Sequence, residues 1–400
     1  MHQPALDGLR GLAVAGVVAF HAGFGWARGG FLGVSTFFTL SGFLITSLLV
    51  TERNRSGRID LPAFWSRRAR RLLPASLATL FAVSVLAGSL ATPEQLHGLR
   101  LDVLAALGYS ANWRFILSGQ SYGSLFAAPS PILHFWSLAI EEQLYVVFPL
   151  LVVFVARRWL APVLGALVAG SVALGFVLYH PGGSTSAAYY GTGVRAGELL
   201  VGALLALLVA SRRDPARPFG TTAAGVGGVT ALAVLFVAWS TMRQDATVLY
   251  RGGFVVHALV TSVVIAACLV PGPVRSALSL APLRALGRIS YGVYLYHWPV
   301  FVWLTPERAH VDGGALVLAQ LGVTLAIAVA SYRFLEQPIR RGRRVGDRRP
   351  LVAIPIAVLL VAGVATASTV HPPAAPAFDL SAAAAPMPVQ RPVTPVAPVA

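Results

Sequence analysis

Apolar runs of about 20 residues recur along the whole of this 400-residue sequence. A helix needs about 20 apolar residues to cross the hydrocarbon core of a bilayer. Only 12% of the residues are charged, about half the fraction found in soluble domains. Because lipid offers no hydrogen bonds, a backbone that crosses it must pair its own polar groups, as helices do. The sequence therefore predicts an all-α fold, a polytopic membrane helical bundle.

The apolar runs predict eleven spans. They cover residues 7–27, 30–50, 72–92, 136–156, 159–179, 198–211, 219–240, 253–271, 289–305, 314–335 and 351–369. The sixth is the shortest, because the polar pair Arg195 and Glu198 precedes its apolar run. At spacing i, i+3 these two residues are expected to form an ion pair within one helix, near the outer surface.

The arginines predict the topology. All 31 basic residues are arginine, and 21 of them lie in alternate connecting segments: 52–71, 157–158, 211–217, 272–288 and 336–350. Cytoplasmic loops of membrane proteins carry the excess of positive charge. We therefore expect a multi-pass protein of a bacterial plasma membrane, with a cytoplasmic N-terminus and an extracytoplasmic C-terminus. The net charge of +16 is then a topology signal, and no nucleic-acid partner is expected.

Composition divides the chain into three predicted parts. Residues 1–342 form the membrane domain, and 343–370 a basic loop with an additional span. Residues 371–400, with 8 proline and 9 alanine residues, cannot bury a core and are expected to be a disordered extracytoplasmic linker. The linker is either a stalk or the lead to a further extracytoplasmic domain, fused or separate. The single cysteine, Cys268, leaves no disulfide or cysteine-based metal site, and no metal is expected.

Two ionisable residues in the first predicted span are candidates for function. Arg10 and His21 are eleven residues apart, which is close to three helical turns, so they share one face about 16 Å apart along the axis. Ionisable groups inside a membrane are costly and mark functional sites by default. The structural alternative is an arginine that reaches the interface and a histidine bonded to neighbouring backbone.

The stretch "HFWSLAIEEQLY" opens the fourth span with a second polar group. His134, Ser137 and Glu141 share one helical face, and Glu142 follows directly. Two adjacent carboxylates at a span entrance are expected to face a wet cavity or a cation. The alternative is a structural ion pair, or anions that favour the positive end of the helix dipole.

The stretch "FWSRRARRLLPA" places Arg67, Arg68, Arg70 and Arg71 where a cytoplasmic loop enters the third span. Arginine pairs phosphate oxygens through two-pronged hydrogen bonds, so this cluster could hold a phosphorylated cofactor. Contact with anionic lipid headgroups explains the same residues. In the ninth span, "GRISYGVYLYHWPV" adds the polar side chains of Ser290, Tyr291, Tyr294 and His297, with Ser290, Tyr294 and His297 on one side of the helix. The alternatives are aromatic-belt anchoring for the tyrosines and a structural role for the histidine.

Taken together, these motifs resemble the acyltransferase 3 family of bacterial membrane O-acyltransferases. The resemblance rests on "LDGLRGLAVAGVVAFHAG", "GGFLGVSTFFTLSGFLIT", "FWSRRARRLLPA", "HFWSLAIEEQLYVVFPLL", "GRISYGVYLYHWPV" and "SYRFLEQPIRR", in that order between residues 5 and about 342. It implies a ten-helix acyltransferase core, here with an eleventh span. Its R-x10-H pair falls on Arg10 and His21, and its arginine-rich motif on Arg67 to Arg71. Many members carry an acid where this chain has Ser35, so the acid's role would pass to Glu141 or Glu142.

The resemblance implies acyl transfer from cytoplasmic acyl-CoA, most simply acetyl-CoA, to a hydroxyl of an envelope glycan, glycolipid or glycosylated metabolite. Acyl-CoA is a donor substrate, and no permanently bound cofactor is expected. His21 would act as general base or carry the acyl group, with Arg10 and Glu141 or Glu142 stabilising charge. Arg67, Arg68, Arg70 and Arg71 would bind the phosphates of acyl-CoA. The candidate substrate contacts are Ser35, His134, Ser137, Tyr291 and His297. The alternative function is a transporter or flippase of a lipid-linked sugar, although no internal repeat of the kind many transporters carry is visible.

Overall fold

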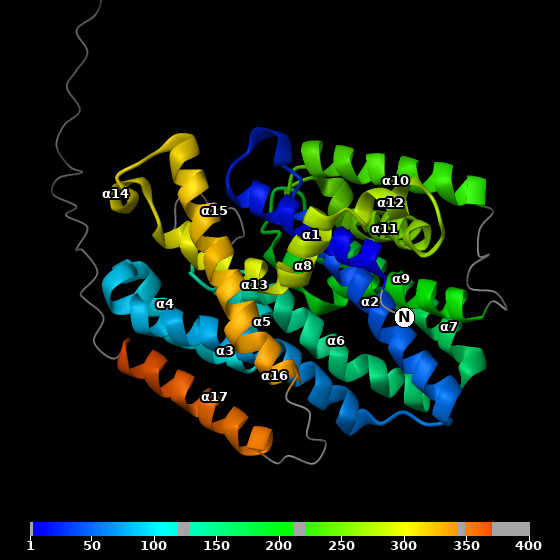
Figure 1. Ribbon diagram of the computed structural model, residues 1–400, viewed down its shortest axis with the longest axis horizontal. Coiled ribbons are helices and arrows are strands. Elements are labelled where there is room, and N and C mark those ends of the chain that lie inside the picture. The colour runs from blue at the N-terminus through cyan, green and yellow to red at the C-terminus, as the bar shows by residue number, and fades with distance from the viewer. Residues whose placement is uncertain (1–2, 119–128, 212–220, 342–348, 370–400) are drawn as a thin grey trace, which may run out of the picture.

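The computed structural model describes residues 3–118, 129–211, 221–341 and 349–369, which form helices and no strands. The longer helices are α1 (Pro4–His21), α2 (Leu32–Ser56), α3 (Leu61–Leu90), α4 (Pro93–Leu107), α6 (Phe135–Phe154), α7 (Arg157–Leu178), α9 (Thr192–Ala210), α10 (Thr221–Thr241), α11 (Phe254–Leu269), α13 (Ala281–Trp303), α15 (Gly313–Ala330) and α17 (Arg349–Ala367). The shorter ones are η1 (Gly25–Ala27), α5 (Ala111–Leu117), α8 (Ser186–Tyr190), η2 (Leu249–Gly253), α12 (Pro273–Leu278), α14 (Pro306–Ala309), η3 (Ser331–Glu336) and α16 (Gln337–Arg341). The fold is therefore an all-α membrane bundle, as predicted (Figure 1).

Each of the eleven predicted spans coincides with one of these helices. Within the described residues, eight helices are long and apolar enough to cross a membrane by length and composition. The helices α1 and α13 are not among the eight, and the apolar part of α17 is the shorter segment Ile354–Ala367. The number of eleven crossings stays a prediction. The predicted linker 371–400 and most of the basic loop that begins at residue 343 lie outside the described residues.

The third helix begins eleven residues before the predicted span. The side chain of Asp60 caps α3 by accepting a hydrogen bond from the backbone N–H of Ala63, and Pro62 occupies the first turn. Both features favour a helix start. The arginine cluster is therefore helical, and residues three apart in it lie on one face.

Helices α1 and α13 pack with their backbones almost in contact (Figure 1). A Cβ atom added to Gly287 on α13 would lie 1.8 Å from the carbonyl oxygen of Asp7, and one added to Gly11 on α1 would lie 2.2 Å from that of Leu283. Small residues allow this close approach between membrane helices. The contact brings the His21 end of α1 beside the second half of α13.

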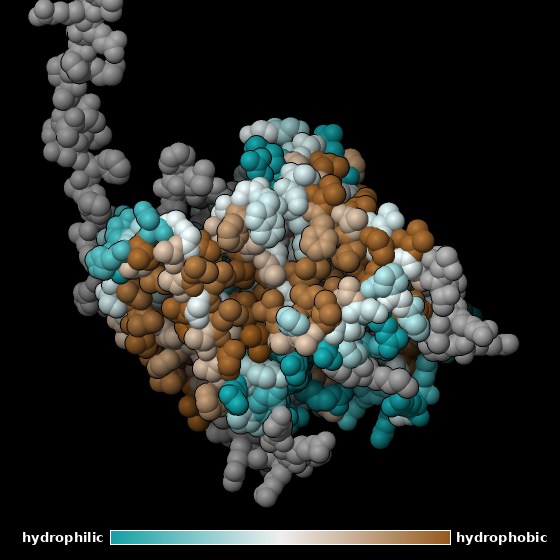
Figure 2. Space-filling model, turned by 45° about the horizontal axis from the view of Figure 1, so that its top comes forward, coloured by the Kyte–Doolittle hydropathy of each residue, from teal (hydrophilic) through white to brown (hydrophobic). Residues whose placement is uncertain are grey.

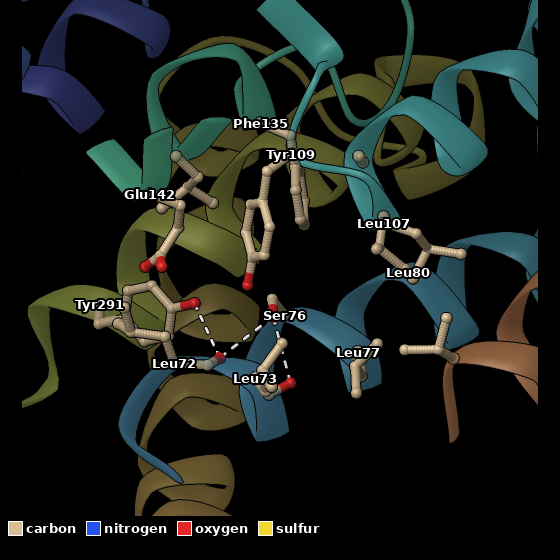
Figure 3. A pocket seen from close by; sticks show the side chains of 13 residues that line it. Leu72, Leu73, Ser76, Leu77, Leu80, Leu107, Tyr109, Phe135, Glu142 and Tyr291 are labelled. Atoms are coloured by element: carbon tan, nitrogen blue, oxygen red, sulfur yellow. Dashed lines mark hydrogen bonds between the residues drawn. The ribbon is translucent and has the colours of Figure 1, made fainter. Parts of the chain in front are cut away.

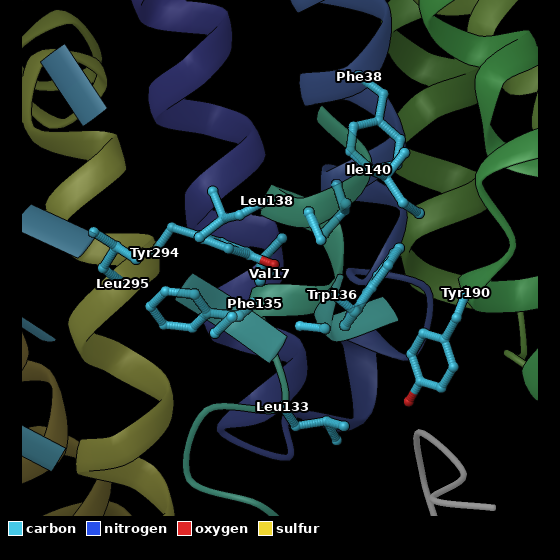
Figure 4. Close-up of a cluster of buried hydrophobic side chains, with 14 of the residues drawn as sticks. Val17, Phe38, Leu133, Phe135, Trp136, Leu138, Ile140, Tyr190, Tyr294 and Leu295 are labelled. Carbon is cyan, nitrogen blue, oxygen red and sulfur yellow. The ribbon is translucent and has the colours of Figure 1, made fainter. Parts of the chain in front are cut away.

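The helices that carry the candidate site residues share one buried core. Figure 4 shows Val17 of α1, Phe38 of α2, Trp136 of α6 and Tyr294 of α13 meeting in it. Trp136 and Phe38 contact edge to face, with ring centroids 6.1 Å apart. Close-packed interiors resist displacement, so this core fixes the four helices relative to one another.

The outer surface is apolar. Figure 2 shows hydrophobic side chains in a broad belt between patches of hydrophilic residues. Large apolar side chains such as Phe154, Phe334 and Leu359 are more than 70% exposed, which a soluble protein would not tolerate over a continuous area. Helix α17 lies along the outside of the bundle against α3 and α4 (Figure 1). The belt is the lipid-facing surface.

Candidate functional site

A cavity of about 210 Å³ lies between α1, α2, α3, α6 and α13. Its polar lining comes from Arg10, Arg68, Arg71, Glu141, Ser137 and Tyr294, with Ser41, Ser290 and Tyr291. Apolar side chains of α2, including Phe37, Ile45 and Leu48, complete the wall. Residues from five of the six quoted sequence stretches thus meet around one space.

The arginine cluster divides between two faces of α3. Arg68 and Arg71, three residues apart, line the cavity. Arg67 is directed away from it, with 57% of its side chain exposed and its Nη2 atom 3.5 Å from Glu52 Oε2. Arg70 is half-buried and does not line the cavity. Only two of the four predicted phosphate-binding arginines are therefore placed to act inside the bundle.

The cationic wall of the cavity is held by Glu141. Its carboxylate accepts hydrogen bonds from Ser41 and Tyr145 and lies 3.4 Å from Nη2 of Arg68. The guanidinium of Arg68 also lies over the Tyr145 ring, 3.4 Å from the centroid. Across the cavity, the Nε atom of Arg10 is buried with no hydrogen-bond partner among the described residues. A buried donor without a partner indicates a place for a ligand or water.

Glu142 faces a different space. Figure 3 shows it directed towards Tyr109 and Tyr291 in a second, smaller pocket that α17 borders. Consecutive helix residues point about 100° apart, so the two carboxylates cannot serve one site. We expected one of them beside His21; the structure places Glu141 in the first cavity and Glu142 in this second pocket.

The ring of His21 contacts aromatic side chains of α13. His21 Nδ1 lies 3.0 Å from His297 Nε2, and its ring contacts Trp298 with centroids 4.7 Å apart. The ring of His134 lies 5.8 Å from that of His297. Three predicted site residues, distant in sequence, therefore form one histidine cluster: His134 and His297, which are fully buried, and His21, which is half-buried.

Tyr294 lies between the cavity and the histidine cluster; its sequence position predicted the same helix side as His297 but no site role. Its hydroxyl is 2.6 Å from Ser137 Oγ and donates to the carbonyl of His134 at 3.0 Å. Its ring centroid is 5.5 Å from those of both His134 and His297. The spacing from Tyr294 to His297, one helical turn, was the available signal.

Ser35 belongs to a separate network. Its hydroxyl accepts a hydrogen bond of 3.0 Å from Arg195 Nη2, and Arg195 Nε donates to Glu198 at 2.6 Å. The predicted pair of Arg195 and Glu198 is confirmed. Both side chains are buried in the protein interior, with the Arg195 guanidinium 4.1 Å from the Phe254 ring centroid. A short polar side chain at position 35 leaves Glu198 as the only carboxylate bonded to this arginine among the described residues.

The arrangement has two chemically distinct ends. Arginine side chains in a cavity bind phosphate or carboxylate groups, and imidazoles accept protons near neutral pH. Tyr294 and Ser137 stand between these ends. A substrate with an anionic head and a reactive end fits this order of groups.

Comparisons with known proteins show the family of this chain. The family model described as an acyltransferase domain, acyltransferase 3, matches residues 3–333. The chain is 40% identical over 363 residues to "Putative peptidoglycan O-acetyltransferase YrhL" of Bacillus subtilis, covering 87% of this chain and 57% of that protein. It is 39% identical over 354 residues to "Peptidoglycan O-acetyltransferase OatA" of Listeria monocytogenes, covering 85% and 56%.

A third relative is "O-acetyltransferase OatA" of Staphylococcus aureus, 36% identical over 351 residues, with 85% of this chain and 57% of that protein covered. The chain thus spans a little over half of the length of the relatives it matches. No solved structure matches it. The family model covers most of the chain, in the same residues that carry the cavity and the histidine cluster, and the chain therefore belongs to the acyltransferase 3 family.

Proposed function

We propose that this chain is a membrane O-acyltransferase that moves an acetyl group from cytoplasmic acetyl-CoA to a hydroxyl of an envelope glycan. The names of the relatives favour peptidoglycan as the acceptor. The observation that carries the proposal is the cavity lined by Arg10, Arg68 and Arg71, which ends at Tyr294 beside the histidine cluster.

In this proposal the arginines bind the phosphates of acetyl-CoA. Arg68 and Arg71 lie on the α3 side and Arg10 on the α1 side, and Glu141 with Tyr145 holds Arg68 in place. Arg67 and Arg70 would attract the donor at the cytoplasmic surface without lining the cavity. The excess of arginine in alternate loops supports a cytoplasmic N-terminus and therefore donor entry from that side.

The chemical step would take place at His21. Its imidazole takes the proton of the acceptor hydroxyl, the hydroxyl oxygen bonds to the acetyl carbonyl carbon, and the carbon–sulfur bond breaks. The proton then passes from His21 to the departing thiolate, so that the products are the acetyl ester and CoA. Because Tyr294 and Ser137 are hydrogen-bonded between the cavity and the histidines, these two side chains must part for the thioester to reach His21.

The predicted substrate-contact residues do not all lie along the cavity. Ser137 and Tyr291 line the cavity and are proposed to contact the pantetheine arm, and His134 adjoins its end. Ser35 is bonded to Arg195 outside the cavity lining, so we propose a packing role for it in place of substrate contact.

The test is acetyl transfer by the full chain in detergent, with radiolabelled acetyl-CoA and crude envelope glycan as acceptor. We expect the wild type to label the glycan and His21→Ala to lose about 10²- to 10⁴-fold in rate, the range of a general base. Transport without chemistry, the alternative function, predicts no labelled ester from the wild type. Full activity of His21→Ala would reject His21 as the general base but would not contradict the proposed acyltransferase activity.

A further inference from the structure

The contact between His21 and His297 bears on which ring nitrogen of His21 carries the proton. His297 is fully buried on α13, and its Nδ1 atom lies 2.6 Å from the backbone oxygen of Tyr294 and 3.2 Å from that of Val293. Its Nε2 atom lies 3.0 Å from Nδ1 of His21. One ring nitrogen of His297, Nδ1, therefore faces backbone carbonyl oxygens, and the other, Nε2, faces the imidazole of His21.

The backbone contacts fix the tautomer of His297. A carbonyl oxygen only accepts hydrogen bonds, so Nδ1 of His297 must carry a proton and donate. In a neutral imidazole the other nitrogen then has the lone pair, which makes Nε2 of His297 an acceptor. His297 is fully buried and forms no ion pair with any described residue, and an unpaired charge is costly in such a place, so its ring is neutral.

The tautomer of His297 in turn determines that of His21. Because Nε2 of His297 accepts, Nδ1 of His21 must be the nitrogen that carries the proton. The lone pair of His21 is then on Nε2, at the edge of the ring directed away from His297. In water the opposite tautomer of a histidine side chain, with the proton on Nε2, is the more stable one, so this choice has to be imposed by the protein.

We propose that His297 is a positioning residue that holds His21 in the Nδ1–H tautomer and so makes Nε2 of His21 the proton acceptor in acyl transfer. The catalytic consequence rests on the proposed function, whereas the tautomer itself does not. The backbone of α13 is the ultimate constraint, since it is the carbonyls of Val293 and Tyr294 that orient His297. Sequence spacing alone gave His297 no such role.

Within the described part of the chain, His297 contacts His21 nitrogen to nitrogen. The described titratable side chains whose rings contact His297 are His21 from α1, His134 just before α6 and Tyr294 on its own helix. The Tyr294 hydroxyl is directed to Ser137 and the His134 carbonyl, and the His134 ring meets His297 edge to face at 5.8 Å. The close nitrogen-to-nitrogen contact at 3.0 Å is that of His21 with His297.

The direct test is nitrogen NMR of the full chain, labelled with ¹⁵N-histidine and held in detergent. The shifts of the two ring nitrogens distinguish the N–H from the lone-pair nitrogen, and His21→Asn assigns the His21 signals by their loss. We expect the proton of His21 on Nδ1 in the wild type. A proton on Nε2 would overturn the proposal, whatever the activity of the protein.

Three variants sharpen the test. His297→Phe removes the acceptor, so His21 should shift towards the Nε2–H tautomer; His297→Gln offers an amide oxygen near the same place and should retain Nδ1–H. His134→Phe, in the same cluster, should leave the His21 tautomer unchanged. His257, which accepts from Trp239 through Nε2, is an internal reference whose signals should not move. An unchanged His21 tautomer in His297→Phe would reject the positioning role.

Activity adds a second readout. We expect His297→Phe to lower kcat by about 10²-fold, near the lower bound for general-base effects, with an unchanged KM for acetyl-CoA, and His297→Gln to retain the larger part of kcat. A raised KM with normal kcat would make His297 a donor contact instead. If the wild type transfers no acetyl group, the proposed function fails while the tautomer result still stands.

Discussion

The guanidinium of Arg195 and the carboxylate of Glu198 are held 2.6 Å apart in the interior of the bundle, with 1% and 0% of their side chains exposed. Both belong to α9, one turn apart, and Ser35 of α2 completes the network. A charge in this place is tolerated only while its partner is present. The pair therefore couples the two helices without contributing to the cavity.

We expect Arg195→Leu to destabilise the protein by about 3–5 kcal/mol, because it leaves Glu198 buried and unpaired. The double variant Arg195→Leu/Glu198→Leu should recover most of the lost stability, since it removes both charges together. Thermal unfolding of the two variants in the same detergent checks this. Equal melting temperatures for the single and double variants would show that the unpaired Glu198 is not the cause of the lost stability.

Removing charge from the cavity wall should weaken donor binding. Arg68→Gln and Arg71→Gln each lose a charged hydrogen-bond donor, worth about 1.5–3 kcal/mol, so we expect KM for acetyl-CoA to rise about 10- to 100-fold. The comparison variant is Arg67→Gln, for which we expect a smaller rise in KM, because Arg67 lies on the exposed face beside Glu52 and outside the cavity. Equal changes in KM at all three positions would contradict phosphate binding in the cavity and would favour a role of the arginines in topology or lipid contact.

The ring of Tyr145 should matter more than its hydroxyl. Arg68 lies over this ring at 3.4 Å, and a cation–π contact contributes about 0.5–2 kcal/mol. Tyr145→Leu should therefore raise KM for acetyl-CoA several-fold, whereas Tyr145→Phe keeps the ring and should stay close to the wild type. A larger loss in the phenylalanine variant would mean that the hydroxyl bond to Glu141 positions Arg68.

The contact between α1 and α13 should tolerate no added methyl group. A Cβ atom on Gly287 would lie 1.8 Å from the Asp7 carbonyl oxygen, so Gly287→Ala forces the helices apart at a cost of about 1–3 kcal/mol. Activity should fall with stability, because His21 and His297 lie on these two helices. Gly165→Ala on α7, where a Cβ atom would meet nothing within 4 Å, is the control and should be neutral or stabilising. Normal activity of Gly287→Ala would show that the helices adjust without disturbing the histidine pair.

The sequence by itself determined the fold class and the helices. Apolar runs, arginine-rich loops and low charge are local properties, and each predicted span coincides with a helix. The predicted starts were less accurate for helices that begin with polar residues, such as α3, because hydropathy does not detect a capping residue such as Asp60. Helical spacing also predicted the Arg195–Glu198 pair, because both residues lie on one helix.

Which motifs meet was decided by the tertiary structure. Helical spacing placed Arg10 and His21 on one face but gave no partner for either. One partner of His21 is His297, 276 residues away, and the carboxylate that lines the cavity is that of Glu141 and not that of Glu142. Such pairings depend on how α1, α6 and α13 pack around close glycine contacts and a shared core. Periodicity fixes the face that a side chain occupies on its own helix, whereas the rotation and depth of neighbouring helices follow from their packing.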